Sequence, residues 1–509
     1  MAEYIIAHDL GTSGDKATLF SAEGRLLSSS VCSYDTHYFN GTWAEQNADD
    51  WWEAVCRSTR QLLGEAGIRP EKVGAVSFSG QMMGCLCVDR TGRPLRPSII
   101  WADTRALDQA AAIERTIPQE EFYRITGHRN TASYGVQKLM WIREHEPGVY
   151  AATCKVLNAK DYIIYRLTGT FLTEYSDANS MDCFDINKLG WSQELICAAN
   201  IDADKLPDAV PSTHIAGRVT DEAASLTGLA AGTPVIMGAG DGVTANVGAG
   251  SIRPGKTYCC LGTSAWITTT SEKPLYDPQM RTVTWVHAVP GLYAPNGTMQ
   301  TAGGAYSWLK NTICLDEIER AERMNAERPD GAGRVSPYDI INSEIEQSPP
   351  GANGVIFLPY LMGERAPRWN PQATGVFAGL RAETTRADIL RSVLEGVTLN
   401  LALILDILRE SADIEEIIAV GGGAKGRVWR RIMADLFGTN ILVPDILEEA
   451  GSMGAAVIGG VGAGMYDGFN AIDRFLHIRE VQEPDRSTGE VYARARERFE
   501  AFYHAVENL

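Results

Sequence analysis

The tetrapeptide Leu-Gly-Thr-Ser occurs twice in this chain, at residues 10–13 and again at residues 261–264. Apolar residues typical of β-strands flank both copies, so each copy predicts a strand–tight turn–strand hairpin. Glycine permits a sharp turn and a close approach of a ligand to the backbone, and hydroxyls with successive N–H groups form a concavity suited to phosphate. Two such hairpins facing each other would hold one nucleoside triphosphate from two sides. The alternative is two unrelated turns, because Gly-Thr-Ser is common in turns.

The residue before the leucine distinguishes the two copies: it is Asp9 in the first and Cys260 in the second. A carboxylate beside a phosphate-binding turn is what a Mg²⁺ site requires, because Mg²⁺ is usually held by one or two carboxylates together with phosphates and water. We therefore predict that Asp9 binds Mg²⁺. The alternative is an aspartate that only stabilises the turn.

Length and charge limit the classes of protein to consider. With 509 residues the chain is too long for one ordinary core, which predicts two or more domains. The net charge of −18 argues against nucleic-acid binding, because no basic excess is present to neutralise phosphates. No apolar run reaches the ~20 residues of a membrane span, and a strand predicted from Tyr4 leaves no room for a signal peptide. We therefore expect a cytoplasmic protein that binds neither nucleic acid nor membrane.

Strand and helix patterns alternate along most of the chain, which is typical of an α/β fold with much parallel pairing. A strand pattern at 73–78 ends in a glycine-rich turn, and the second half repeats this logic at 417–426. A stretch rich in glycine and proline near 248–254 separates the two halves. We therefore predict two domains and a helical C-terminal extension, at residues 1–247, 252–480 and 481–509.

Two glycine motifs suggest other functions. Residues 250–257 match the P-loop pattern, but a P-loop follows a strand and opens a helix, whereas this segment follows a helix pattern and opens a strand. We interpret it as a connection with a turn. Residues 421–426 match the dinucleotide fingerprint, with Asp445 about 20 residues further on. A dehydrogenase is therefore a rival hypothesis, but it leaves the repeated tetrapeptide unexplained, and the same turn could hold the adenosine end of ATP.

Further segments resemble one family. Residues 1–14, with Asp9 and the first hairpin, resemble the opening of the FGGY carbohydrate kinases, whose fold duplicates an actin-like, ribonuclease-H-like ATPase domain. Residues 375–395 match the family's second signature, and 138–141 resemble the core of its first, although Gly135 stands where that signature prefers a small hydroxyl or proline. The segments most like the xylulokinase members are 43–46, 51–52, 80–84 and 100–105. These motifs follow one another in the family's order.

The resemblance implies an α/β fold of two actin-like domains with a cleft between them, in which ATP binds mainly to the second domain and a sugar mainly to the first. It implies that Asp241 is the catalytic base and that Asp9 is the acid at the Mg²⁺–phosphate centre. The implied nucleotide-binding residues are Thr12, Ser13, Lys16, Gly262, Thr263, Gly303, Gly422 and Gly423. The implied substrate-binding residues are Gln81, Met82, Met83, Trp101, Asp103 and Asp241. As partners we expect ATP and a small sugar, and we leave a homodimer open.

Elementary chemistry agrees with the role of Asp241. A sugar hydroxyl is a poor nucleophile at neutral pH, and a carboxylate within hydrogen-bond reach can accept its proton as the phosphoryl group arrives. Asp241 follows a strand on a glycine-rich turn at the head of a helix, where α/β proteins place such groups, although aspartate there also serves as a helix N-cap. For Met82 and Met83 the alternative is core packing, and at least one should be core because neighbours on a strand face opposite ways.

Two departures from the xylulokinase pattern concern the substrate. Met83 stands where those enzymes usually carry histidine, and Gly242 stands where they usually carry asparagine after the catalytic acid. Both changes remove groups that would hydrogen-bond a sugar. We predict phosphorylation of D-xylulose to D-xylulose 5-phosphate, with gluconate, another ketose or a polyol as alternative substrates. The rival from another class is an actin-like ATPase that phosphorylates nothing.

Overall fold

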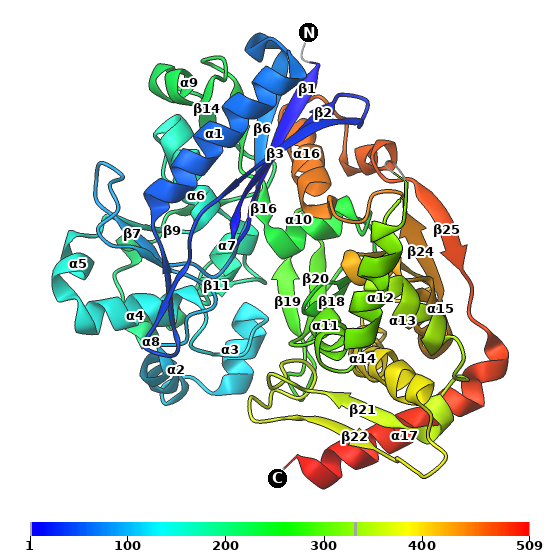
Figure 1. Ribbon diagram of the computed structural model, residues 1–509. Helices are drawn as coiled ribbons and strands as arrows, with labels where there is room; N and C mark the ends of the chain where they lie inside the picture. Colours follow the sequence, from blue (N-terminus) through cyan, green and yellow to red (C-terminus); the bar gives the residue numbers. More distant parts are fainter. Residues whose placement is uncertain (1–2, 330–332, 508–509) are drawn as a thin grey trace.

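Two seven-stranded sheets dominate the computed structural model, which describes residues 3–329 and 333–507. Strands from the first half of the chain form one sheet, and strands from the second half form the other (Figure 1). The strands of the first sheet are β1 Tyr4–Leu10, β2 Gly14–Ser21, β3 Leu26–Ser33, β6 Val73–Gly80, β14 Ile215–Arg218, β15 Pro234–Ile236 and β16 Ala239–Gly240. The strands of the second are β17 Thr257–Leu261, β18 Ala265–Thr269, β19 Val283–Val286, β20 Tyr293–Met299, β23 Glu416–Val420, β24 Asn440–Pro444 and β25 Ile478–Gln482.

The two sheets repeat one topology. In each, an antiparallel hairpin comes first: β1 with β2, and β17 with β18. A third strand, β3 or β20, pairs antiparallel on one side of the hairpin, and a parallel strand, β6 or β23, pairs on the other. A second parallel strand follows, β15 or β24, with an antiparallel strand beyond it, β14 or β25. The α/β class and the two predicted hairpins are confirmed.

Helices cover both faces of each sheet, so the central strands are continuous apolar runs. In β1, Ile6 packs toward α1 in one apolar cluster, and its neighbour Ile5 packs toward α16 in another. The helices of the first half are α1 Ala48–Ala66, α2 Leu107–Glu114, α3 Gln119–Thr126, α4 Gly135–His145, α5 Pro147–Ala152, α6 Ala159–Thr168, α7 Tyr175–Asn179, α8 Gln193–Ala199, α9 Asp221–Thr227 and α10 Asp241–Gly248. Those of the second half are α11 Gly303–Thr312, α12 Leu315–Ala326, α13 Pro337–Ile345, α14 Arg386–Leu408, α15 Arg427–Phe437, α16 Ala450–Gly462 and α17 Gly489–Val506.

Short strand pairs extend the two halves. In the first half they are β4 His37–Phe39, β5 Trp43–Gln46 and β8 Ser98–Ile99, β7 Leu86–Val88 with β9 Lys155–Leu157, β10 Leu172–Glu174 with β13 Asp208–Val210, and β11 Phe184–Asp185 with β12 Gly190–Trp191. In the second half, β21 Ile356–Pro359 pairs with β22 Gly375–Ala378. The C-terminal helix α17 packs on β21 and α14 (Figure 1). Within residues 3–329 and 333–507, none of the helices combines the length and the apolarity of a membrane span.

Two helices, α10 of the first half and α16 of the second, each pack against the sheet of the other half. α16 lies beside β1 and β6 of the first sheet, orange against blue in Figure 1, where Val457 joins the apolar cluster of Ile5 and Ala75. α10 directs Ala245 to the second sheet, where it shares a cluster with Tyr258. These two helices therefore connect the two halves of the molecule.

Glycines let α10 and α16 cross with their backbones in contact. A Cβ built on Gly248 of α10 would lie 1.8 Å from the carbonyl oxygen of Ala450, and one built on Gly454 of α16 would lie 1.8 Å from the carbonyl oxygen of Thr244. No side chain larger than hydrogen fits at either crossing point unless the helices move apart.

The segment with the P-loop pattern is a connection, as the sequence context predicts. α10 ends at Gly248 and β17 begins at Thr257, so no helix follows the motif. The ammonium of Lys256 forms an ion pair with Glu416 at the start of β23. This lysine therefore links the connection before β17 to the start of the neighbouring strand β23.

The helix crossing generates a stability prediction. Replacing Gly454 by alanine should lower the free energy of unfolding by about 1–3 kcal/mol, because overpacking of a close contact outweighs the better helix propensity of alanine. The midpoint of urea unfolding measures this change. The matched control is Gly64→Ala in α1, where a Cβ would meet no described atom within 4 Å. Equal midpoints for the two variants would show that the crossing tolerates a methyl group.

Candidate functional site

Polar residues gather where three strands of the first sheet end. The register places Asp9 of β1 opposite Ser79 of β6, and Gly240 of β16 opposite Gly80 of β6. Asp241 follows Gly240 directly and begins α10. Because parallel strands end at one edge of a sheet, this order brings Asp9 and Asp241 to the same edge, where α/β proteins bind ligands.

Asp9 is a half-buried carboxylate close to the start of α16. A Cβ built on Gly451, in the first turn of α16, would lie 3.2 Å from Oδ2 of Asp9. Burial raises the pKa of Asp9, while a hydrogen bond from Ser79 and the charge of Lys16 partly offset that rise. The ionised form is therefore incompletely stabilised by the protein, and a bound cation would stabilise it further.

Asp241 combines an exposed residue with a raised pKa. The surrounding protein desolvates its carboxylate and raises the pKa to about 6, and the negative charge of Asp9 acts in the same direction. The N–H of Gly242 donates to Oδ1 at 2.7 Å, which opposes the rise. Both observations fit a carboxylate that lies between the two halves with solvent on one side. A group that a ligand can reach, with a pKa near neutrality, suits proton transfer.

The turn of the first hairpin is held by its carbonyl oxygens. The hydroxyl of Tyr34 donates to the carbonyl of Gly11 at 2.6 Å, and Nε2 of Gln46 donates to the carbonyl of Thr12 at 2.6 Å. In a trans peptide the N–H points away from the carbonyl of the preceding residue. The N–H groups of Thr12 and Ser13 are therefore directed away from these side chains, and the turn presents backbone donors that suit an anion.

The turn of the second hairpin is held in the same manner by the start of α11. The N–H of Gly303 donates to the carbonyl of Gly262 at 2.9 Å, and the N–H of Gly304 donates to the carbonyl of Thr263 at 2.9 Å. A Cβ built on Gly303 would lie 2.4 Å from the carbonyl oxygen of Gly262, so this position requires glycine. The N–H of Gly303 is therefore used to orient the turn.

A glycine turn lies next to the second hairpin. Gly422 and Gly423 stand on the 3₁₀ turn η4 Gly422–Lys425, which follows β23. A Cβ built on Gly423 would lie 2.8 Å from Cβ of Leu261, which ends β17. At Gly422, by contrast, no described atom lies within 4 Å of such a Cβ, and the residue is exposed. Gly422 therefore offers accessible backbone beside the hairpin.

Lys16 connects the first hairpin with the second half of the chain. Its Nζ lies 2.9 Å from Oε2 of Glu449 and donates to the carbonyl of Glu448 at 3.2 Å. Glu449 directly precedes α16. Contact between Lys16 and a phosphate would therefore require the lysine to leave Glu449.

The two methionines of the predicted sugar site lie in different surroundings. Met82 is buried, and a Cβ built on Gly240 would lie 2.5 Å from its Sδ. Met83 is half-buried with φ of +62°, and its N–H donates to Oγ of Ser180 at 3.0 Å. Its carbonyl accepts a hydrogen bond from Nζ of Lys138 at 2.8 Å. Met82 is buried, as expected for at least one of the pair, but both residues follow the end of β6 and neither lies on a strand.

Gln81 and Trp101 both contact the first hairpin. Gln81 is buried; its Nε2 lies 3.4 Å from the carbonyl oxygen of Gly11 and donates to Oε1 of Gln46 at 2.8 Å. Trp101 is 37% exposed, and its Nε1 donates to Oγ1 of Thr12 at 2.9 Å. The predicted sugar residues and the first phosphate turn therefore form one connected surface.

Asp103 is turned toward the protein. Its carboxylate is buried and accepts hydrogen bonds from the guanidinium of Arg105 and, at 2.6 Å, from the N–H of Ala44. In this arrangement Asp103 fixes the loop that carries Trp101, and it does not face solvent.

Sequence reasoning missed two polar links around Asp241. Oγ1 of Thr244 lies 2.8 Å from Oγ of Ser79 and donates to the carbonyl of Asp241 at 2.9 Å, which joins α10 to the end of β6. The hydroxyl of Tyr258 donates to the carbonyl of Gly242 at 3.1 Å. Thr244 stands about one helical turn after Asp241, and this spacing is the only signal in the sequence that pointed to it.

Comparisons with known proteins identify the family. Residues 4–248 match the model of the FGGY family of carbohydrate kinases, N-terminal domain, and residues 257–463 match the C-terminal domain of the same family. The chain belongs to the FGGY family of carbohydrate kinases. The kinase is 31% identical to a gluconokinase of Bacillus licheniformis, with 100% of this chain and 97% of that protein covered. It is also 31% identical to a xylulose kinase of Staphylococcus xylosus, with 92% of each chain covered. The crystal structure of xylulose kinase from Rhodospirillum rubrum matches it with a TM-score of 0.88 at 30% identity, over 99% of both chains.

Family membership decides between the rival functions. The protein is a sugar kinase with two domains of the actin-like ATPase fold, as the ordered motifs predicted. It is neither the dehydrogenase that the glycine motif at 421–426 suggested nor an ATPase without a sugar substrate. The domain limits 1–247, 252–480 and 481–509 and the roles of individual residues stay predictions.

The raised pKa of Asp241 predicts a pH dependence. Below about pH 6 the protonated carboxyl prevails and cannot accept a proton, so kcat/KM for the sugar should fall about tenfold per pH unit.

Asp241→Asn should lower kcat by about 10²-fold or more while sparing ATP binding. Steady-state kinetics between about pH 4 and pH 8, ~2 units on either side of the transition, measure both effects. Asp221→Asn, an exposed aspartate at the start of α9, is the matched control and should change neither. An Asp241→Asn enzyme that keeps more than about a tenth of the wild-type kcat would exclude the role of base.

Proposed function

We propose that this kinase transfers the γ-phosphoryl group of ATP to a hydroxyl of a ketopentose, with D-xylulose as the first candidate substrate and D-gluconate as the second. One observation carries the proposal: the carboxylate of Asp241, partly desolvated and with a pKa of about 6, lies at the same sheet edge as Asp9 and the first hairpin. A base for a hydroxyl and a cradle for phosphate therefore stand together. Similarity to a gluconokinase and to xylulose kinases supports both candidates.

In the proposed reaction the sugar hydroxyl gives its proton to Asp241 while its oxygen bonds to the γ-phosphorus. The bond from that phosphorus to the bridging oxygen breaks, and ADP leaves. Because the N–H of Gly242 already binds Oδ1, we assign Oδ2 of Asp241 as the proton acceptor. General-base catalysis of this kind typically contributes 10²–10⁴-fold, and the rest comes from positioning and charge stabilisation.

Backbone donors of the two hairpins are the proposed phosphate ligands. The N–H groups of Thr12 and Ser13 serve this purpose on the first hairpin, and those around Gly262 and Thr263 serve it on the second. The exposed backbone of Gly422 is our candidate contact for the adenosine end of ATP, because it lies beside the second hairpin. Such donors are fixed before the ligand arrives, so they stabilise phosphate charge without reorganisation.

The surroundings of Asp9 fit Mg²⁺ bound together with the nucleotide. Across residues 3–329 and 333–507, no group of three or more His, Cys, Asp or Glu side chains gathers that could hold a metal ion alone. Mg²⁺ does not need one, because it usually combines one or two carboxylates with substrate phosphates. Asp9 would supply the carboxylate, and Mg²⁺ would neutralise charge on the phosphates. We propose that closure of the two domains, divided near residues 247–252, then excludes water from the reaction.

The substrate proposal rests on the groups near the predicted sugar site. A Cβ built on Gly242 would meet no described atom within 4 Å, so space is free beside the base. Two nearby lysines are held by the protein: Nζ of Lys138 donates to the carbonyls of Met83 and Ile100, and Lys160 pairs with buried carboxylates. Neither is available to pair with the carboxylate of an aldonate. This favours an uncharged ketose over gluconate.

A magnesium titration tests the role of Asp9. Asp9→Ala should raise the Mg²⁺ concentration needed for half-maximal rate and lower turnover, because one proposed metal ligand is lost. The affinity for the sugar, measured by calorimetry without nucleotide, should stay close to the wild-type value. A collapse of sugar affinity with unchanged Mg²⁺ dependence would place Asp9 in the sugar site instead.

A double variant tests the substrate. Met83→His with Gly242→Asn should shift preference toward D-xylulose by up to about 1–3 kcal/mol in transition-state binding, because it restores two hydrogen-bonding groups. Both positions can accept the change: histidine tolerates the left-handed φ of residue 83, and residue 242 has free space. The measurement is kcat/KM for ketoses, polyols and aldonates in both proteins. A strong wild-type preference for D-xylulose that the double variant leaves unchanged would show that these positions do not set specificity.

A further inference from the structure

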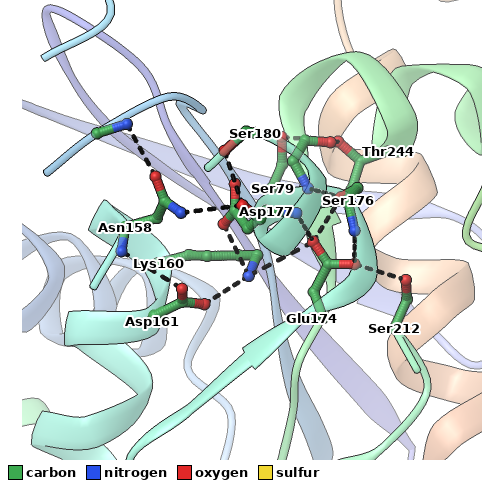
Figure 2. A network of polar contacts seen from close by, with 12 residues as sticks. Ser79, Asn158, Lys160, Asp161, Glu174, Ser176, Asp177, Ser180, Ser212 and Thr244 are labelled. Carbon is green, nitrogen blue, oxygen red and sulfur yellow. Dashed lines mark hydrogen bonds and ion pairs between the residues drawn. The ribbon is translucent and has the colours of Figure 1, made fainter. Parts of the chain in front are cut away.

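A buried ionic cluster joins α6, the end of β10 and α7 (Figure 2). Nζ of Lys160 lies 2.7 Å from Oδ1 of Asp161, 2.9 Å from Oδ2 of Asp177 and 3.7 Å from Oε1 of Glu174. All four side chains are buried. We call these four residues the Lys160 cluster.

Such a cluster is costly to bury. Taking several charges out of water costs several kcal/mol for each ion, and apolar residues of similar volume are often as stable or more stable. One lysine faces three carboxylates, and burial raises the pKa of Asp177 well above its usual range. Stability alone therefore gives little reason for this arrangement, and its connections to the site supply another.

The first connection leads from the cluster to the catalytic aspartate. Glu174 caps α7 by accepting hydrogen bonds from the N–H groups of Ser176, at 2.9 Å, and Asp177, at 2.8 Å. Oγ of Ser176 in turn accepts a hydrogen bond from the N–H of Gly240 at 2.9 Å. Gly240 directly precedes Asp241, so the cluster fixes the backbone that carries the base.

The second connection leads to the methionine of the sugar site. The hydroxyl of Ser180, at the end of α7, donates to the carbonyl of Asp177 at 2.8 Å and accepts from the N–H of Met83 at 3.0 Å. The N–H of Gly84 donates to Oδ1 of Asn158. Asn158 is the N-cap of α6, the helix that carries Lys160. The short helix α7 and the residue after it therefore hold the backbone of Met83 and that of Gly240, while the N-cap of α6 holds Gly84.

The stem of Lys160 adds a third contact. A Cβ built on Gly80 would lie 2.9 Å from Cβ of Lys160, so the lysine packs tightly against the end of β6. Gly80 opens the segment that runs through Met82 and Met83. The segments 80–84 and 240–241 thus both rest on the Lys160 cluster.

We propose that Lys160 is a positioning residue of this kinase, which through its cluster holds the sugar-contact segment 80–84 and the base-bearing segment 240–241 at a fixed separation. The inference rests on the proposed function, because it gives the two segments the roles of sugar contact and base. Lys160 itself is buried and touches no reacting atom. A purely structural cluster would instead affect stability without separating the two kinetic roles.

Two serine variants separate the connections while they keep all four charged side chains of the cluster, although Ser176→Ala also removes the hydrogen bond that this hydroxyl donates to Glu174. Ser176→Ala removes the acceptor for Gly240 and should lower kcat about tenfold with little change in KM for the sugar, since small misplacements of a catalytic group cost up to about 10²-fold. Ser180→Ala removes the acceptor for Met83 and should raise KM for the sugar about tenfold with a smaller effect on kcat. The control is Ser392→Ala in α14, a buried serine whose hydroxyl donates to the carbonyl of Ile389 at 2.8 Å. Kinetics of both variants equal to those of this control would overturn the inference.

Lys160 is tested directly by Lys160→Met and Lys160→Arg. Lys160→Met should accelerate amide hydrogen exchange in peptides spanning both segments, 80–84 and 240–241, while peptides of the second sheet exchange at the wild-type rate. Lys160→Arg keeps the charge and should restore protection partly. If Lys160→Met does not fold, exchange in the serine variants decides: Ser176→Ala should loosen only 240–241, and Ser180→Ala only 80–84. Loosening of both segments to the same extent in each serine variant would refute separate connections.

The exchange experiment needs no substrate, so it separates the two proposals. A wild-type enzyme that phosphorylates no sugar in the panel refutes the proposed function. Exchange that is unchanged in Lys160→Met refutes the positioning role even where D-xylulose is an excellent substrate.

Discussion

The close crossing of α10 and α16 is the contact on which the rest of this kinase depends. Gly248 and Gly454 let the two helix backbones touch, and each helix also packs against the sheet of the other half. The same helices reach the functional site. α10 begins with Asp241, and the first turn of α16 lies against Asp9. Any change in the angle between the two halves therefore moves the base, which the first sheet carries, relative to the turn of the second hairpin.

Burial raises the pKa of carboxylates in two groups of the first half, and the two groups differ in what lies beside them. In the Lys160 cluster, carboxylates are buried around an ammonium group and bound by backbone and side-chain donors. Asp9 and Asp241 stand close enough to raise the pKa of Asp241, and for both the largest effect is desolvation that the protein does not fully compensate. Stabilisation of their charge is thus left to what binds there. Such a site favours the binding of a cation, and it places a carboxylate whose pKa suits proton transfer.

The sequence predicted the parts of the fold that follow from local pattern. The repeated tetrapeptide gave both hairpins because glycine and hydroxyl residues between two apolar runs favour a tight turn. The context of residues 250–257 identified a connection because a strand, β17, follows the motif. The position of Asp241 at a helix start also followed from a strand ending in glycines.

Other features depend on contacts between distant segments, which no local pattern encodes. Lys160 beside Asp161 resembles an exposed pair on a helix, yet it is buried because β10 and α7, more than ten residues later, supply Glu174 and Asp177. Asp103 has the sequence context of a ligand-binding residue, but Arg105 and the β5 backbone occupy its carboxylate. α16 follows strands of the second sheet in the chain, yet it packs on β1 and β6 of the first sheet. In each case the deciding partner is far away in the sequence.

The two phosphate turns differ in what orients them, and this difference affects how the protein can diverge. Side chains of Tyr34 and Gln46 orient the first turn, whereas N–H groups at the start of α11 orient the second. The second turn therefore needs no particular side chain, but the close approach of Gly303 to the carbonyl of Gly262 leaves room for glycine alone at that position. The first turn keeps its shape only while particular side chains are retained. Divergence at the first turn is therefore limited by the identity of two side chains, and divergence at the second by the space that one glycine leaves.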